Sequence, residues 1–120
     1  MKIEKTGNLQ NFQRLNYKNV SSLDRKYFVR PNLQDLKLLG DKYNINLTSC
    51  YSDVKGYESI DIEVSKLKNL GFFKRLFEKK GRSSFQVGYT IFDEPTKAKE
   101  DFMVAVNEAI ADLKAKLAKN

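Results

Sequence analysis

The sequence predicts an α+β fold: an antiparallel sheet of three to five strands packed against two main helices, with a short amphipathic helical insert between the last two strands. Two observations predict the sheet, because apolar and polar residues alternate along 59–66 and again along 84–92. A third predicts a long helix, since apolar residues recur every three or four positions over 102–117. At 120 residues, the chain is expected to form a single domain over 1–120.

The first stretch, 1–24, is polar and rich in Asn and Gln, and its apolar residues are widely spaced. We expect it to be a weakly structured or edge-strand extension with one short strand near 11–17. Residues 26–30, KYFVR, have the aromatic and β-branched content of a second short strand, which Pro31 would end.

A first helix is expected directly after this proline. Asn32 is suited to cap its start, and Asp35 would complement the helix dipole in the first turn. Asn44 is a residue type that often ends helices. The apolar residues of this helix recur at helical spacing and are Leu33, Leu36, Leu39 and Tyr43.

Three strands should follow. The first covers 45–52 and leads into turn residues at 53–56. The second, 59–66, has one dry and one wet face, and the third covers 84–92. Because neighbouring strands are joined by turns, we expect antiparallel pairing. The dry face of the second strand would consist of Ile60, Ile62 and Val64.

A long second helix should begin after Pro95, with Thr96 as its N-cap. Lysines near its end would interact favourably with the helix dipole. Its apolar stripe should pack across the sheet, as in two-layer α+β folds. The residues of that stripe are Phe102, Val106, Ala109, Leu113 and Leu117.

The side-chain inventory argues against several classes of chemistry. The chain has no His, which removes the commonest general base, and its one Cys cannot form an intramolecular disulfide. We therefore expect no enzymatic activity, no cofactor and no metal site. Cys50 is expected to be a small buried apolar residue. Asp61 and Glu63 share a strand face, where an acid/base pair is conceivable, but a solvent-facing role beside Lys or Arg is expected.

The sequence also bears on location. No apolar run approaches the ~20 residues that span a bilayer, and the N-terminal residues lack the apolar stretch of a signal peptide. We therefore expect a cytoplasmic protein.

Positive charge is concentrated in one place. Between 66 and 82 there are seven cations and a single acid, which accounts for six of the seven net positive charges. We define 67–83 as the basic insert. Within it, 70–80 places its aromatic and leucine side chains on one side of a helical wheel and its cations on the other. Asn69 could cap the start of this short helix, and Gly81 its end.

Three interpretations of the basic insert are open. Its aromatic face could pack on the protein's own sheet and leave the lysines merely solvated. Its cations could bind the phosphates of nucleic acid, a reading that is compatible with the first. A membrane surface is the third possibility, although eleven residues without Trp make a weak anchor.

Residues 32–117 have the element order α-β-β-β-α, and in this order they resemble the double-stranded RNA-binding domain. The segment TKAK, 96–99, is similar to the basic helix entrance with which that family contacts phosphates. The resemblance implies binding to a duplex. The chain departs from the family pattern in having no His and in carrying the insert 67–83.

The sequence therefore predicts a non-enzymatic small binding domain whose basic insert engages a polyanion, with nucleic acid as the expected ligand. The alternative is a protein-interaction module, such as an inhibitor, an immunity protein or a phage or mobile-element accessory protein, that docks an acidic partner surface. In either case the expected contact residues are Lys66, Lys68, Lys74, Arg75, Lys79, Lys80 and Arg82.

Overall fold

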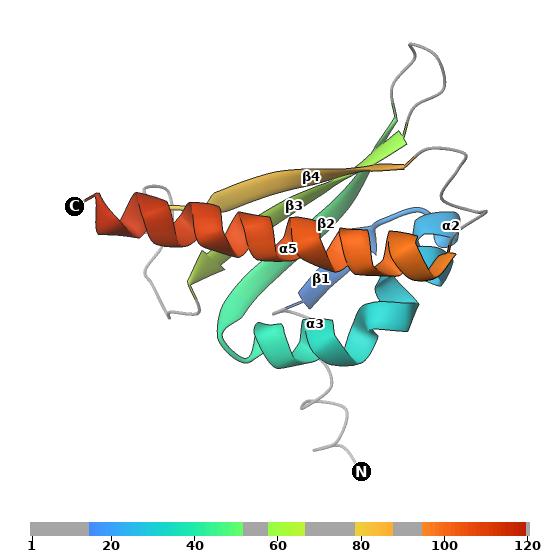
Figure 1. The fold of residues 1–120 in the computed structure, drawn as a ribbon, viewed down its shortest axis with the longest axis horizontal. Helices are drawn as coiled ribbons and strands as arrows, with labels where there is room; N and C mark the ends of the chain where they lie inside the picture. Colours follow the sequence, from blue (N-terminus) through green and yellow to red (C-terminus); the bar gives the residue numbers. More distant parts are fainter. Residues whose placement is uncertain (1–14, 52–57, 67–78, 88–94, 120) are drawn as a thin grey trace.

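The structure is a computed structural model that describes residues 15–51, 58–66, 79–87 and 95–119. Within these ranges the strands form one sheet in the order β1-β2-β3-β4, and the helices lie on one of its faces (Figure 1). The fold is thus a two-layer α+β arrangement, as predicted. The strands are β1 (Leu15–Asn19), β2 (Tyr43–Tyr51), β3 (Glu58–Lys66) and β4 (Gly81–Val87).

Two helical regions cover the sheet. The first is a continuous run of helical turns that starts at Ser22 and ends at Gly40, and the second is one long C-terminal helix that contacts β4 and β3. Figure 1 shows the long helix crossing in front of the strands, with α3 below it. The helical elements are α2 (Ser22–Asp24), the π-helix η1 (Arg25–Val29), the 3₁₀-helix η2 (Arg30–Asn32), α3 (Leu33–Gly40) and α5 (Pro95–Ala118).

The sheet is mixed, which corrects the prediction of a purely antiparallel sheet. β2 pairs antiparallel with β3, and β3 pairs antiparallel with β4, as expected. β1, however, pairs parallel with β2, with Leu15 opposite Ile45. The reason lies in the connection: a helical crossover joins β1 to β2, and such a crossover returns the chain to the same end of the sheet.

The predicted strand at 26–30 is wrong, because these residues are helical. Ser21 caps the start of the helical run, since its Oγ accepts a hydrogen bond from the N–H of Asp24 at 3.1 Å. Pro31 lies inside the run, where the backbone changes from a π-turn to a 3₁₀-turn. The buried positions recur every four residues, at Asp24, Phe28, Asn32, Leu36 and Gly40. Because only two of these five are apolar, the helical pattern was hidden in the sequence.

Asn32 does not cap a helix, contrary to the prediction. It is buried inside the helical run, and its side chain makes no capping hydrogen bond. Its Nδ2 donates to the carbonyl oxygen of Phe28 at 2.8 Å and to that of Lys99 at 3.3 Å. Asn32 therefore links the first helical region to the start of α5.

The end of the first helix was predicted too late in the chain. α3 ends at Gly40, where a tight turn follows: the N–H of Lys42 donates to the carbonyl of Leu39 at 3.0 Å. Tyr43 and Asn44, which were expected in and after the last helical turn, are the first residues of β2. Tyr43 packs against the core from the sheet and not from the helix.

The predicted alternation of β3 is confirmed, and Ile60, Ile62 and Val64 are fully buried. β4 begins at Gly81, three residues before the predicted start at 84. Gly81 therefore opens a strand and does not end a helix. The chain needs glycine here because a Cβ at this position would overlap the carbonyl oxygen of Ala109. α5 can thus pack directly onto the start of β4.

The apolar stripe of α5 is confirmed: Phe102, Val106, Ala109 and Leu113 are fully buried, and Leu117 packs at its end. Pro95 is already the first residue of the helix, so Thr96 lies within it and is not the N-cap. An aromatic cluster joins three elements, since the ring of Phe28 lies 5.1 Å from that of Phe85 and 6.0 Å from that of Phe102. This cluster forms the centre of the core.

Several predictions fall on residues outside the described ranges. These are the part of the first strand before 15, the turn at 53–56, the last part of the third predicted strand at 88–92 and most of the helix at 70–80. Of that helix only Lys79 and Lys80 are described, and neither is helical.

Candidate anion-binding site

Four of the seven predicted contact residues are described. Lys66 is exposed and is the last residue of β3, the strand whose Val64 lies opposite Gly81 on β4. Lys79 and Lys80 directly precede β4, and Arg82 is its second residue. Lys68, Lys74 and Arg75 lie outside the described residues.

The start of β4 and the end of α5 together form an open pocket of about 280 Å³. All of the described residues that line it are cationic: Lys79, Lys80, Arg82, Lys116 and Lys119. Three of these were predicted as contact residues. The sequence placed the other two at the C-terminus of the last helix, where cations complement the dipole, without associating them with the basic insert. Packing of α5 onto Gly81 brings the two groups together.

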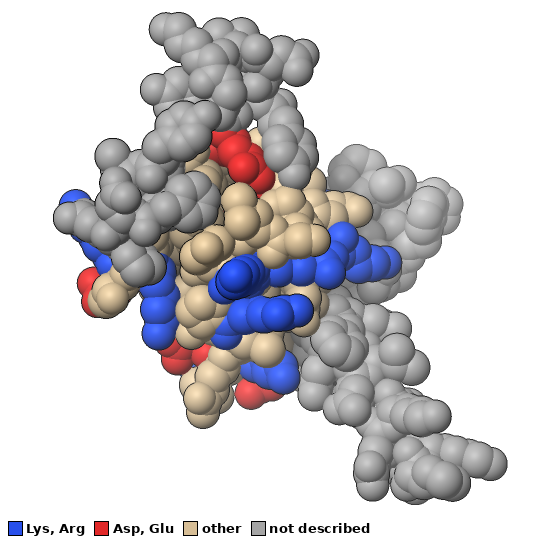
Figure 2. Space-filling model, turned by 90° about the vertical axis from the view of Figure 1, so that its right-hand side faces the viewer, with Lys and Arg blue, Asp and Glu red and all other residues tan. Residues whose placement is uncertain are grey.

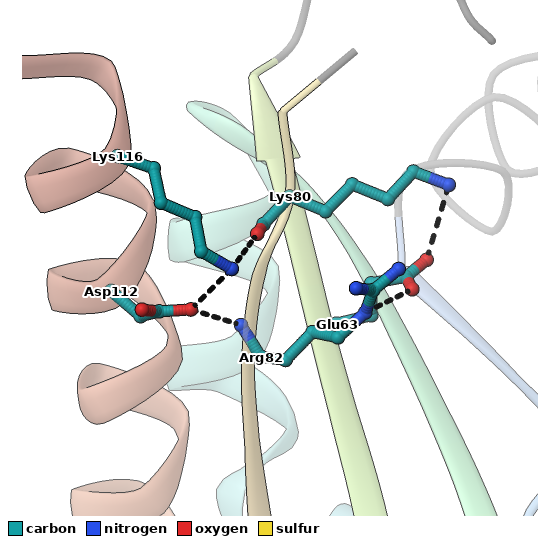
Figure 3. A network of polar contacts seen from close by, with 5 residues as sticks. All are labelled: Glu63, Lys80, Arg82, Asp112 and Lys116. Carbon is teal, nitrogen blue, oxygen red and sulfur yellow. Dashed lines mark hydrogen bonds and ion pairs between the residues drawn. The ribbon is translucent and has the colours of Figure 1, made fainter. Parts of the chain in front are cut away.

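Lys116 ties the two segments to each other (Figure 3). Its Nζ donates to the carbonyl oxygen of Lys80 at 2.8 Å and forms an ion pair with Asp112 at 2.9 Å. In return, Nζ of Lys79 donates to the carbonyl oxygen of Lys116 at 3.0 Å. These reciprocal contacts give Lys79 and Lys116 a structural role, because they hold the residues before β4 against the last turns of α5.

Glu63, on the neighbouring strand β3, has the basic neighbours that the sequence predicted for this strand face. It pairs with Nζ of Lys80 at 3.5 Å and with Nε of Arg82 at 3.1 Å (Figure 3). Part of the positive charge of the pocket is therefore neutralised from within the molecule. Because the single carboxylate of Glu63 pairs with both Lys80 and Arg82, these three residues together keep one net positive charge.

Asp112 completes the site from α5. It accepts the backbone N–H of Arg82 at 2.9 Å, at the edge of the sheet. This hydrogen bond is the main reason that the pKa of Asp112 is lowered, and the contact with Lys116 adds to it. Among the described residues, the two carboxylates of Glu63 and Asp112 face the five lining cations, so the cations outnumber the acids by three.

Some N–H donors of the pocket's side chains are not used within the described part of the protein and can bind an anion. An ammonium group has three N–H donors and a guanidinium group has five. Arg82 pairs with Glu63 through Nε, so that its Nη groups take no part in that contact. Lys119 is exposed, and no hydrogen bond or ion pair joins its side chain to the described residues. The arrangement can therefore accept the oxygen atoms of a phosphate or carboxylate group.

A second basic surface lies at the other end of α5. Lys97 and Lys99 in its first turns, and Lys26 and Arg30 in η1 and η2, are exposed, and α5 contacts both of these short helices. Figure 2 looks onto this end and shows Lys and Arg side chains gathered at its centre. The segment 96–99 was noted in the sequence, but only the fold shows that cations from the first helical region lie at the same end.

Cys50 is not the buried apolar residue that was expected. It is half-buried on the polar face of the sheet, which none of the described helices covers, and its Sγ donates to Asp61 at 3.0 Å. This hydrogen bond is the main reason that the pKa of the thiol is raised, with burial and the charge of Asp61 acting in the same direction. A raised pKa keeps the thiol protonated, which lowers its reactivity as a nucleophile.

Over 15–51, 58–66, 79–87 and 95–119, no three His, Cys, Asp or Glu side chains come together in a way that could hold a metal ion. In the same part of the chain, no helix combines the length and the apolar character needed to cross a membrane. Comparisons with protein families, curated proteins and solved structures find nothing that matches this chain.

Proposed function

We propose that this protein is a non-enzymatic binding domain that acts in the cytoplasm and engages a polyanion, namely nucleic acid, through its phosphate groups. The observation that supports the proposal most is the pocket whose described lining consists of five cations from two segments of the chain. The second basic surface at the opposite end of α5 adds further positive charge on exposed residues.

The chemistry of the lining favours phosphate contacts over base readout. Lysine acts as a compact point charge with donors that rotate freely, whereas reading a base edge requires donors in a fixed geometry. Four of the five lining residues are lysines. Binding should therefore be largely independent of sequence, with affinity derived from the release of counterions.

Glu63 and Asp112 set the strength of this interaction. They hold Lys80, Arg82 and Lys116 in place, which fixes part of the cationic surface before a ligand arrives. Their negative charge also repels phosphate and reduces affinity. A moderate, salt-sensitive interaction is expected from this balance, and not a tight one.

The first test measures fluorescence anisotropy of a labelled duplex and a labelled single strand at about 50 and about 200 mM salt. If the five lining cations each contact a phosphate, affinity for a duplex should fall by about 500-fold over this range, from a slope of about −0.9 per contact. Fewer contacts give a proportionally smaller slope. An absence of binding to both probes at low salt would reject the proposal.

The second test assigns the site. Replacing Lys80 and Lys119 together with Gln should weaken binding and reduce the salt slope, and it leaves the structural contact of Lys79 intact. The matched control replaces two exposed lysines outside the pocket and outside the second basic surface, with the same loss of charge: Lys18 and Lys37. Equal effects of the two double variants would show that net charge, and not the pocket, drives binding.

An acidic protein surface would use the same cations, and that alternative is an outcome of these experiments. If neither nucleic acid binds, a protein that co-purifies with the wild type but not with the pocket variant would identify the domain as a protein-interaction module.

A further inference from the structure

Glu58 occupies an unusual position for an acid. It is the first residue of β3, two residues before Ile60, so it lies on the strand face that is covered by the helices. The exposed acid of this strand, Asp61, lies on the opposite, polar face. A carboxylate at the margin of a dry face loses part of its hydration and needs a partner.

A second acid meets Glu58 there. Asp24, at the end of α2, is completely buried, and Oδ2 accepts a hydrogen bond from Oγ of Ser49 at 2.7 Å. Its other oxygen, Oδ1, is also buried, and no described residue donates a hydrogen bond to it. Glu58 lies close to Asp24, because Oγ of Ser21 contacts both residues: it accepts from the N–H of Asp24 and donates to Oε1 of Glu58.

Two serines close the arrangement. Oγ of Ser21 donates to Oε1 of Glu58 at 3.3 Å, and its backbone N–H donates to Oγ of Ser49 at 2.9 Å. The two serines and two acids therefore connect the start of α2 with β2 and β3. Each serine proton already has an acceptor, so neither can supply the missing donor for Oδ1 of Asp24.

Charged and titratable groups nearby do not neutralise the two acids. Arg25 directs Nη2 to the carbonyl oxygen of Lys18 at 2.8 Å, and its guanidinium group lies 5.7 Å from the centre of the Tyr17 ring. Lys26 lies over the ring of Tyr27. In the sheet, Glu58 is paired with Tyr51 on β2 and with the apolar Val87 on β4, and neither residue type is a cation. Among the described residues, the pair thus has no counter-cation.

We propose that the Glu58 carboxyl group, in its protonated form, donates a hydrogen bond to Oδ1 of Asp24, so that a single proton links the two acids. This proton gives Oδ1 of Asp24 the donor that it lacks among the described residues, and it removes one of two adjacent negative charges. The hydrogen-bonded pair then links α2 to the start of β3, and this link depends on pH.

The direction of the pH effect follows from the equilibrium. The pKa of Glu58 is raised, first by burial and then by the hydrogen bond and the charge of Asp24. The folded protein therefore holds this proton at pH values where the unfolded chain has released it. The stability that it contributes is complete below the ordinary value of 4.5 and is lost as the pH rises through the raised pKa.

The test uses Glu58→Gln, whose amide can donate to Asp24 at any pH and whose oxygen can still accept from Ser21. Urea-unfolding midpoints of the full chain are measured from about pH 5 to about pH 9. The wild-type midpoint should shift down relative to that of the variant as the pH rises. Glu108→Gln, an exposed change on α5, should follow the wild type at every pH. Parallel curves for wild type and Glu58→Gln would overturn the proposal.

A second measurement needs no variant. The ¹³C NMR signal of the Glu58 carboxyl group should titrate above 4.5 in the folded wild type, and a midpoint at or below this value would overturn the shared proton. A third measurement adds Mg²⁺ or Ca²⁺ at about pH 8. If either ion raises the unfolding midpoint of the wild type but not of Glu58→Gln, the pair holds a metal ion in place of the proton, and the proposal fails.

Discussion

Individual residues decide how closely the two layers of this protein approach each other. At Gly81 a side chain would overlap the backbone of α5 at Ala109 and would lie 2.6 Å from the backbone nitrogen of Leu113. The absence of a Cβ lets β4 and α5 meet, and this contact places Lys116 beside Lys80. The glycine at position 81 therefore allows α5 to bring Lys116 to the residues that precede β4.

Gly81→Ala should destabilise the fold by about 2 kcal/mol or more, because the obstructing atoms belong to backbone that cannot move alone. Urea unfolding followed by circular dichroism measures the change. Ser84→Ala, an exposed change on the same strand, is the control and should stay within about 0.5 kcal/mol of wild type. A Gly81→Ala variant as stable as wild type would contradict the packing described at this position.

At the scale of elements, α5 organises the covered layer. It is 24 residues long, and its buried stripe contacts β4, β3, η1 and η2. Phe102 on this helix packs 5.7 Å from the ring of Phe85 on β4, and both rings contact Phe28 in η1. Three elements distant in sequence therefore share one aromatic cluster.

Phe102→Ala should lower the free energy of unfolding by about 3–5 kcal/mol, since the substitution leaves a cavity where three rings meet. Val104→Ala on the same helix is the matched control. Val104 is 55% exposed, so its truncation should change stability by about 0.5 kcal/mol or less. Chemical denaturation of both variants measures the difference. Similar losses for the two would show that Phe102 does not lie in the core.

At the scale of the whole molecule, one buried cluster contains residues from β1, the first helical region, β2, β3, β4 and α5. The sheet has one covered face, and its other face carries polar side chains such as those of Asn46, Asp61 and Gln86. The described residues thus have a single core to which every strand contributes. The two basic surfaces lie outside this core, at opposite ends of α5.

A single core predicts a single unfolding transition. Tyr17, Tyr27 and Tyr43 pack against the core from β1, η1 and β2, so tyrosine fluorescence should report on the same event as far-UV circular dichroism. The two probes should give the same midpoint in urea. Separate midpoints would show that the edge strand β1 or the first helical region unfolds independently.

The periodic elements were predictable because their pattern records which side is buried. β3 and α5 lie where alternation and helical spacing placed them, and Glu63 has the basic neighbours that were expected. The same alternation rule assigns Glu58 to the dry face, so its unusual position could have been found from the sequence. The helical run from Ser22 to Gly40 was not predictable in this way, since polar residues and glycine occupy three of its buried positions.

The candidate site was predicted in part. Lys79, Lys80 and Arg82 were identified from the concentration of charge, whereas Lys116 and Lys119 join them only through tertiary packing.

Taken alone, the sequence determined the α+β class, the antiparallel pairing of β3 with both β2 and β4, and the concentration of charge before β4. The tertiary structure decided the parallel edge strand, the five-cation pocket and the meeting of Asp24 with Glu58. The physical reason is that periodicity describes how each segment is buried, while pairing and side-chain partners depend on how distant segments pack.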